Sequence, residues 1–282
     1  MISKTQFENE LQLIIQNAIR EDVGDGDHSS LACIPASATG KAKLLVKEDG
    51  IIAGVAFAKM ILDYVDPNLK MEIFIEDGTP VKYGDVIFQV SGSSQSILKA
   101  ERVLLNSMQR MSAIATKTKS YVDLLQGTNT QILDTRKTTP GMRVLEKYAV
   151  RMGGGTNHRM SLSDAALIKD NHIAAAGGVV KAFSLVREKF PSSDIEIEVD
   201  NLQQLREVLP LNPGLVLLDN MNPAQCAEAV ALVAGATKLE ASGGITIENA
   251  RAYAEAGVDY IAVGALTHSA PNFDIGLDMR VE

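Results

Sequence analysis

The sequence predicts an α/β protein in which a mixed N-terminal segment is followed by a β/α barrel or an open doubly wound sheet. Three observations predict this fold class. Strand-like runs separated by turn residues occupy residues 41–90, a long helical pattern covers residues 96–125, and short apolar runs alternate with helical stretches after residue 130. Regular alternation of strand and helix is typical of parallel sheets, whereas closely spaced strands joined by turns are typical of antiparallel ones.

Composition indicates an ordinary globular protein. A chain of 282 residues that is 46% hydrophobic can bury one large core or two modest ones. Its net charge of −8 argues against a general nucleic-acid surface, because such binding depends on many Lys and Arg side chains. No apolar run approaches the roughly 20 residues that span a bilayer, and residues 1–10 lack a signal-peptide core. We therefore expect a soluble cytoplasmic protein.

The two cysteines, Cys33 and Cys226, lie far apart in the sequence and lack the spacing of a metal site. We interpret both as small buried apolar residues and expect neither a disulfide nor a zinc site.

The N-terminal segment begins with a helical pattern over residues 7–18. Strand-like runs follow at residues 41–47, 71–75 and 85–90, and turn residues separate them, which favours an antiparallel arrangement. A long helix over residues 96–125 comes next, and we place the domain boundary within it or just after it.

The second part contains six short apolar runs, each of which is directly followed by a polar residue or glycine. The runs are 131–133, 167–168, 195–197, 216–218, 239–241 and 261–263. No eighth strand, which a complete barrel would need, can be placed. The residues at the carboxyl ends of barrel strands form the active-site face. The sequence therefore predicts a common site for Asp134, Lys169, Glu198, Asp219, Ser242 and Gly264.

Helix signals fill the intervals between these runs. Asn201 with Gln204 resembles a capping box, and Asn222 followed by Pro223 supplies an N-cap and a proline at the first helical position. A further helix is expected over residues 246–256, ending at Gly257.

A basic cluster between residues 136 and 169 opposes the acidic charge of the chain. Part of it, Arg143, Lys147 and Arg151, has helical spacing, and we interpret these three residues as a solvated helix face. The remainder leaves a strand end or follows the glycine run 153–155, where close approach of backbone or ligand is favoured. Arginine forks bind carboxylate or phosphate, and lysine adds a mobile charge. We therefore predict an anion site formed by Arg136, Lys137, His158, Arg159 and Lys169.

Two carboxylates at strand ends, Glu198 and Asp219, admit two interpretations. They could satisfy backbone amides at helix N-termini, or they could contact ribose hydroxyls or Mg²⁺, which prefers oxygen ligands and is often shared with a phosphate. Glycine-containing strand ends at residues 242–244 and 264–265 precede helix starts, which is typical of a phosphate site in a barrel.

The second part contains four long motifs: Leu-Asp-Thr-Arg-Lys-Thr-Thr-Pro-Gly at 133–141, Gly-Gly-Gly-Thr-Asn-His-Arg at 153–159, Leu-Ile-Lys-Asp-Asn-His at 167–172 and Glu-Ala-Ser-Gly-Gly-Ile at 240–245. These motifs resemble those of the quinolinate phosphoribosyltransferase family, also called nicotinate-nucleotide pyrophosphorylase (carboxylating). Segments 21–27 and 263–269 extend the resemblance over most of the chain.

The resemblance implies an N-terminal open α/β sandwich domain and a C-terminal incomplete, seven-stranded β/α barrel. We expect the first over residues 1–112, joined by the tail 272–282, and the second over residues 113–271. It further implies a homodimer or hexamer with shared active sites, requiring Mg²⁺ and phosphoribosyl pyrophosphate but no organic cofactor. The family's activity transfers the phosphoribosyl group to quinolinate with decarboxylation, giving nicotinate mononucleotide for NAD biosynthesis.

The same resemblance implies roles for individual residues. Quinolinate would be held by Arg102 of the partner subunit together with Arg136, His158, Arg159 and Lys169. Phosphoribosyl pyrophosphate and Mg²⁺ would be held by Lys137, Glu198, Asp219, Ser242, Gly243, Gly244, Gly264 and Ala265. The expected catalytic residues are Lys137, Lys169, Glu198 and Asp219, of which Glu198 and Asp219 would be the metal ligands.

Three other functions stay open on the sequence. A nicotinate phosphoribosyltransferase or the related molybdenum-transport protein ModD would share this build, although the number of cations favours a substrate with two carboxylates. A Schiff-base aldolase would use Lys169 at a strand end. A phosphate-sensing barrel without catalysis would leave Glu198 and Asp219 without a task.

Overall fold

The computed structural model describes residues 4–192 and 194–281, and the chain divides into two compact units. Residues 120–137 and 155–266 form the parallel unit, and residues 4–119, 138–154 and 267–281 form the antiparallel unit. Residues 1–3 and 282 of the expected domain ranges lie outside the described residues. The expected boundary after residue 112 falls inside the continuous helix α4 (Ser94–Leu124). Because each unit combines separate ranges of the sequence, neither is a single continuous stretch of chain.

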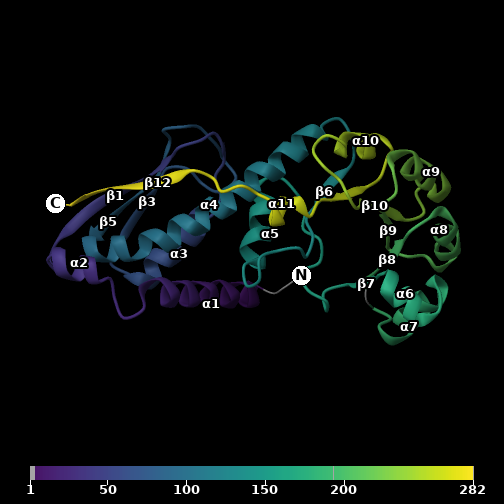
Figure 1. Cartoon of the computed structure of the whole chain (residues 1–282), viewed down its shortest axis with the longest axis horizontal. Helices are drawn as coiled ribbons and strands as arrows, with labels where there is room; N and C mark the ends of the chain where they lie inside the picture. Colours follow the sequence, from purple (N-terminus) through teal and green to yellow (C-terminus); the bar gives the residue numbers. More distant parts are fainter. Residues whose placement is uncertain (1–3, 193, 282) are drawn as a thin grey trace. The chain divides into compact units, whose positions relative to one another are not determined.

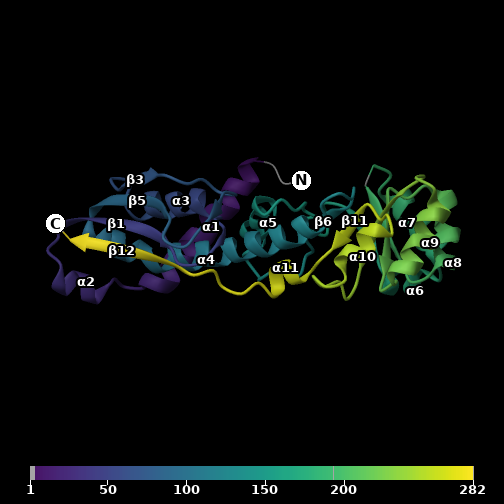
Figure 2. The ribbon, with the colours of Figure 1, turned by 90° about the horizontal axis from the view of Figure 1, so that it is seen from above.

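Four strands form the main sheet of the antiparallel unit, in the order β12-β1-β5-β3. Side chains at alternate positions of β1 are buried, as expected for a sheet with one face on a core. β12, the C-terminal strand, lies alongside β1 in both views (Figures 1 and 2). The three predicted strands are confirmed as antiparallel, with the bounds β1 (Thr39–Val46), β3 (Lys70–Ile73) and β5 (Val86–Ser93). The fourth strand, β12 (Ile275–Val281), was not predicted as a strand. Two short strands, β2 (Gly50–Ile51) and β4 (Pro80–Val81), form a separate ladder.

The helices of the antiparallel unit include both helices predicted for the N-terminal segment. They are α1 (Lys4–Val23), α2 (His28–Cys33), α3 (Val55–Val65), α4 and α5 (Arg143–Met152). The expectation that both cysteines are buried is wrong for Cys33, which is exposed, while Cys226 is buried. The reason is local, because the six-residue helix α2 buries only Ser30 and leaves its last residue at the surface.

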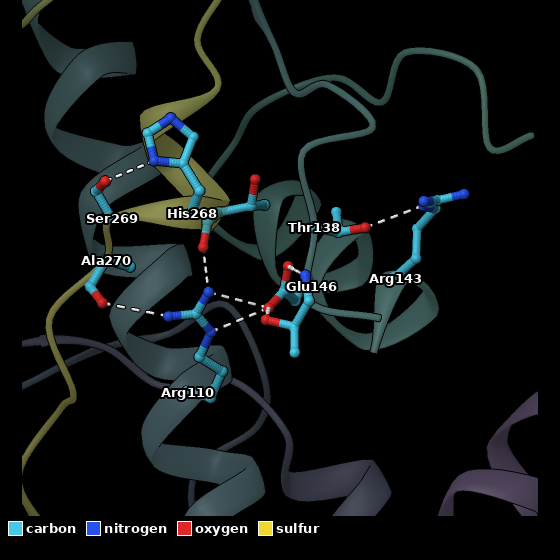
Figure 3. A network of polar contacts seen from close by, with 9 residues as sticks. Arg110, Thr138, Arg143, Glu146, His268, Ser269 and Ala270 are labelled. Carbon is cyan, nitrogen blue, oxygen red and sulfur yellow. Dashed lines mark hydrogen bonds and ion pairs between the residues drawn. The ribbon is translucent and has the colours of Figure 1, made fainter. Parts of the chain in front are cut away.

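A buried ion pair organises part of the antiparallel unit (Figure 3). The Glu146 carboxylate is fully buried and accepts hydrogen bonds from Nε and Nη2 of Arg110, each at 3.0 Å. Thr139 donates to the same carboxylate through its backbone N–H at 3.2 Å and its hydroxyl at 2.8 Å. Arg110 also donates to the carbonyls of Thr267 and Ala270. Such complete pairing is what makes a buried carboxylate tolerable.

The charged face of α5 differs from the prediction of a solvated helix face. Lys147 is buried, Arg143 is half-buried and donates to the Thr138 hydroxyl at 3.0 Å, and only Arg151 is exposed. The prediction is therefore wrong for Lys147. The physical reason is that α5 buries six of its ten residues, so the fold encloses more than its apolar stripe.

Six parallel strands form the sheet of the other unit, in the order β6-β11-β10-β9-β8-β7. All six predicted runs are confirmed as strands, with the bounds β6 (Gln131–Leu133), β7 (Ala166–Ile168), β8 (Ile195–Val199), β9 (Leu215–Asp219), β10 (Lys238–Ser242) and β11 (Tyr260–Ala262). Beyond β6, the backbone adds an isolated parallel bridge between Leu133 and Thr156. Within the described residues, the segment around Thr156 therefore pairs with β6 at this one position and does not form a seventh strand.

Helices follow these strands, and Figure 1 shows α7, α8, α9 and α10 succeeding one another along one side of the sheet. Their bounds are α6 (Asp170–Ala176), α7 (Val179–Lys189), α8 (Leu202–Val208) with the 3₁₀ turn η1 (Leu209–Leu211), α9 (Pro223–Val233), α10 (Ala250–Glu255) and α11 (Ala265–His268). Among the residues described, no helix is both long and apolar enough to cross a membrane.

Helix starts in the parallel unit agree with the cap signals at two positions and differ at a third. Asn201 caps α8 and Asn222 caps α9, each accepting a backbone N–H three residues later. The helix expected from Thr246 begins instead at Ala250. Here the Asn249 side chain accepts the Thr246 N–H at 2.8 Å and donates to the Gly244 carbonyl at 3.1 Å, which closes a turn before the helix.

Candidate active site

A cavity of about 550 Å³ lies at the carboxyl ends of the parallel strands. Its walls combine basic loops, strand-end carboxylates and a glycine turn, all from the parallel unit. The predicted site residues that line it are Arg136, Lys137, His158, Arg159, Lys169, Glu198, Asp219, Ser242, Gly243 and Gly244. The cavity thus gathers residues from the carboxyl ends of all six strands of this sheet, as the topology of a parallel sheet requires.

Three predicted site residues are not in the lining of this cavity. Gly264 and Ala265 follow β11 at the expected strand end. Arg102 is an exposed residue of α4 in the antiparallel unit. The roles that the family resemblance implies for these three stay predictions.

Asp134 fixes the loop that carries His158. Its fully buried carboxylate accepts hydrogen bonds from Asn157 Nδ2 at 2.5 Å and from the backbone N–H of His158 at 2.9 Å. Asp134 directly follows β6, so these bonds tie the 157–159 loop to that strand end. The sequence predicted Asp134 at the site, and its contacts indicate that it positions other residues.

Gly153, in the glycine run before this loop, allows the chain to pack closely against helix α4. A Cβ at Gly153 would lie 2.3 Å from the Ala115 carbonyl oxygen of α4, which is impossible without a backbone shift. Gly154 has a φ of +86°, a left-handed conformation that glycine adopts readily. The expected close approach therefore occurs against backbone of the antiparallel unit.

The two arginines of the cavity influence each other. The Arg159 guanidinium donates from Nη1 to the Ala165 carbonyl at 2.8 Å, which sets its direction. Burial, together with the charge of Arg136, lowers the pKa of Arg159. Two guanidinium groups that repel one another in a partly enclosed site favour a ligand with negative charge between them.

Glu198 lies at the centre of the acidic wall. Its Oε2 forms an ion pair with Lys169 Nζ at 3.1 Å, and its Oε1 accepts the Asp170 N–H at 3.4 Å at the start of α6. Glu198 is buried, whereas about half of the Lys169 side chain is exposed to solvent, at 49%. Glu198 therefore satisfies a helix amide, one of the two predicted interpretations, and still directs an oxygen toward the cavity.

Three carboxylates at this wall, those of Glu198, Asp200 and Asp219, each offer one oxygen, and these oxygens all lie within 4.8 Å of one another. Oxygen atoms from two or three carboxylates suit Mg²⁺, which binds oxygen ligands and completes its shell with water or phosphate. The donor set therefore fits the metal that the sequence predicted.

Sequence reasoning missed three residues of this region. Glu196 and Glu240 are buried acids inside β8 and β10, and Asn220 lines the cavity with a positive φ of 53°. The sequence contained a signal for Glu196. Residues 195–198 alternate Ile and Glu, and alternate residues of a strand lie on the same face of the sheet, so Glu196 had to share a face with Glu198.

Replacement of Gly243 tests the tight turn at the end of β10. Gly243 has a φ of +96°, and a Cβ there would lie 2.1 Å from Asn220 Oδ1 and 3.1 Å from the Asn220 nitrogen. Gly243→Ala is expected to lower the free energy of unfolding by about 1–3 kcal/mol and to displace Asn220 from the cavity. Gly244→Ala is the matched control, since Gly244 also has a positive φ, of +59°, but a Cβ there meets nothing within 4 Å. Equal losses for the two variants in urea unfolding would contradict this account.

The fold and this cavity define a class: a β/α-barrel protein whose strand-end site combines cations for a polyanionic small molecule with carboxylates for a metal or sugar. Comparison with known proteins is more specific. The family model described as the N-terminal domain of quinolinate phosphoribosyl transferase matches residues 27–112, and the C-terminal domain model matches residues 114–278. The chain belongs to the quinolinate phosphoribosyl transferase family.

Individual relatives agree over the whole length. The chain is 45% identical to nicotinate-nucleotide pyrophosphorylase (carboxylating) of Mycobacterium leprae, covering 99% of this chain and 100% of the relative. It is 44% identical to quinolinate phosphoribosyltransferase (decarboxylating) 1b of Nicotiana tabacum, covering 97% and 83%. The crystal structure of NadC from Streptococcus pyogenes is similar with a TM-score of 0.93 at 36% identity, covering 100% of this chain and 99% of that one.

Proposed function

We propose that this protein transfers the phosphoribosyl group of phosphoribosyl pyrophosphate to quinolinate and removes one carboxylate, giving nicotinate mononucleotide, pyrophosphate and CO₂. Its membership of the family and the names of relatives that match over nearly all of this chain support the proposal. The observation that carries it is the single cavity that Arg136, Arg159 and Lys169 line together with Glu198 and Asp219. One wall suits a dicarboxylate, and the other suits a ribose with a metal-bound pyrophosphate.

The basic wall would hold the quinolinate carboxylates. Arg136 and Arg159 offer planar forks, which bind carboxylates through paired hydrogen bonds, and Lys169 adds a mobile ammonium group. His158 belongs to the same wall, with a side chain that is 11% exposed. The ring nitrogen of the substrate would then be held close to the sugar, so that binding energy is used for orientation.

The acidic wall would hold the phosphoribosyl pyrophosphate. Glu198 and Asp219 would bind Mg²⁺ or the ribose hydroxyls, and the metal would neutralise charge on the departing pyrophosphate. Lys137 and the turn at residues 242–244 would contact phosphate groups. As the bond to pyrophosphate lengthens, positive charge develops on the sugar, and fixed carboxylates nearby stabilise it. The positive charge of the alkylated ring nitrogen then stabilises the electron pair that stays on the neighbouring carbon when the adjacent carboxylate departs, so no organic cofactor is needed.

We further propose a homo-oligomer in which Arg102 completes the quinolinate site of the partner subunit. Arg102 is exposed on α4, as a residue must be that binds a ligand on another subunit. A two-fold symmetric dimer would create two identical shared sites.

The two strand-end carboxylates are expected to affect turnover more than quinolinate binding. Asp219→Ala is the cleaner test, because Glu198 also forms an ion pair with the proposed quinolinate ligand Lys169. We expect Asp219→Ala to lower kcat by about 10²-fold or more, the usual cost of lost transition-state electrostatics. Calorimetry should show quinolinate affinity within a few-fold of the unaltered protein. Lost quinolinate affinity with unchanged turnover at saturation would contradict the placement of Asp219 beside the ribose.

A further inference from the structure

Two buried acids and a histidine of the parallel unit lie close together next to the cavity. His158 Nε2 lies 2.7 Å from Glu196 Oε2 and 3.5 Å from Glu240 Oε2. Glu196 is on β8 and Glu240 is on β10, and their exposed fractions are 5% and 1%. Glu240 also belongs to the lining of the cavity that holds the proposed substrate site, whereas Glu196 does not.

The hydrogen bonds of His158 leave Oε2 of Glu240 without a donor. The backbone N–H of Arg159 donates to Nδ1 of His158 at 2.8 Å, so the ring proton is on Nε2. That proton is directed at the nearer acceptor, Glu196 Oε2. Within the described part of the chain, Glu240 Oε2 receives no hydrogen bond although it is buried. An ionised oxygen in this position would be costly, whereas a carboxylic acid would not.

The charges around Glu240 also favour its protonated form. The groups that face it are His158 from the loop after Gly155, Glu196 from β8, Asp134 from the end of β6 and Lys169 from the end of β7. Burial, followed by the charges of Glu196 and Asp134, raises the pKa of Glu240 well above its usual range, and Lys169 opposes this shift only in part. A bound dianionic substrate would favour the protonated form further, because an ionised Glu240 would repel it.

We propose that Glu240 is the acid that protonates ring carbon 2 when the carboxylate on that carbon leaves as CO₂. This inference rests on the proposed function. The bond between ring carbon 2 and the carboxylate breaks, and its electron pair stays on carbon 2 beside the positively charged ring nitrogen. The proton of the Glu240 carboxyl group then forms the new C–H bond. Glu240 becomes a carboxylate and regains a proton from solvent after product release. Without a proton donor, the carbon would recombine with CO₂.

The test separates the two chemical steps in Glu240→Gln, which keeps the shape of the side chain and removes the transferable proton. In a single turnover with quinolinate, phosphoribosyl pyrophosphate and Mg²⁺, pyrophosphate release should proceed at close to the unaltered rate. Release of CO₂ should fall by about 10²-fold or more, the usual contribution of a general acid, and quinolinate mononucleotide should accumulate. Equal slowing of both steps, or slowing of neither, would overturn the proposal. If the unaltered protein released neither product, the proposed function itself would be wrong.

Glu196→Gln is the matched control, because it changes a buried acid of the same cluster and keeps an acceptor for His158. Its CO₂ release should stay within a few-fold of the unaltered rate at neutral pH. In the unaltered protein the rate of CO₂ release should fall as pH rises through the raised pKa of Glu240, since the acid is lost there. In Glu196→Gln this decline should begin at lower pH, because a neighbouring negative charge has gone. A decline at the same pH in both proteins would contradict the role of Glu240.

Discussion

Nicotinate is expected to be turned over roughly 10⁴-fold less efficiently than quinolinate, as judged by kcat/KM. The proposed substrate wall contains Arg136, Arg159 and Lys169, and the charges of the two arginines already disfavour each other. Quinolinate offers these cations two carboxylates, whereas nicotinate offers one. A cation left without its carboxylate in a partly enclosed site costs free energy that the missing group would have supplied.

The measurement is nicotinate mononucleotide formation from each acid under identical concentrations of phosphoribosyl pyrophosphate and Mg²⁺. Picolinate, which keeps only the carboxylate next to the ring nitrogen, provides a second single-acid comparison; since it cannot give nicotinate mononucleotide, its turnover is followed by pyrophosphate release. Comparable kcat/KM for nicotinate and quinolinate would show that one carboxylate suffices. The protein would then be better described as a nicotinate phosphoribosyltransferase.

Arg102→Ala and Lys169→Ala homo-oligomers are each expected to be nearly inactive, and mixing them should restore activity. If Arg102 enters the partner's site, every site of either homodimer lacks one cation for the substrate. In a heterodimer both defects fall in one site, which leaves the other whole. With random pairing, half of the dimers are mixed, so roughly a quarter of all sites are intact.

A mixture of Lys169→Ala with Asp219→Ala is the matched control. Both residues line the same cavity of one chain, so a mixed dimer contains no intact site and should stay inactive. Native mass spectrometry should confirm that mixed dimers form in both experiments. If they form and the Arg102→Ala mixture shows no more activity than its parents, the shared site is wrong.

Much of the parallel unit could be predicted because its sequence pattern has a single geometric consequence. Parallel strands direct their carboxyl ends to one edge, so the residues that end each apolar run, such as Lys169, Glu198 and Asp219, had to lie together. The basic loop residues Arg136 and Arg159 follow from the same geometry, since each lies on a loop next to β6.

Other features depend on tertiary contacts that no local pattern reports. Lys147 has the spacing of an exposed helix face, but the folded chain buries its side chain. The later start of α10 depends on side-chain hydrogen bonds of Asn249. Glu240 interrupts an apolar strand as a single acid, and only its position beside His158 gives it a chemical role. Arg102 does not line the cavity of its own chain, so the role that we propose for it would require an oligomer.

The most direct test of the proposed function is a complete turnover by the unaltered protein. Incubation with quinolinate, phosphoribosyl pyrophosphate and Mg²⁺ should yield nicotinate mononucleotide, pyrophosphate and CO₂ in equal amounts, and omission of any one component should abolish all three products. Quinolinate labelled with ¹³C in the carboxylate next to the ring nitrogen should release its label as ¹³CO₂. Absence of nicotinate mononucleotide, or a product that retains the label, would contradict the account.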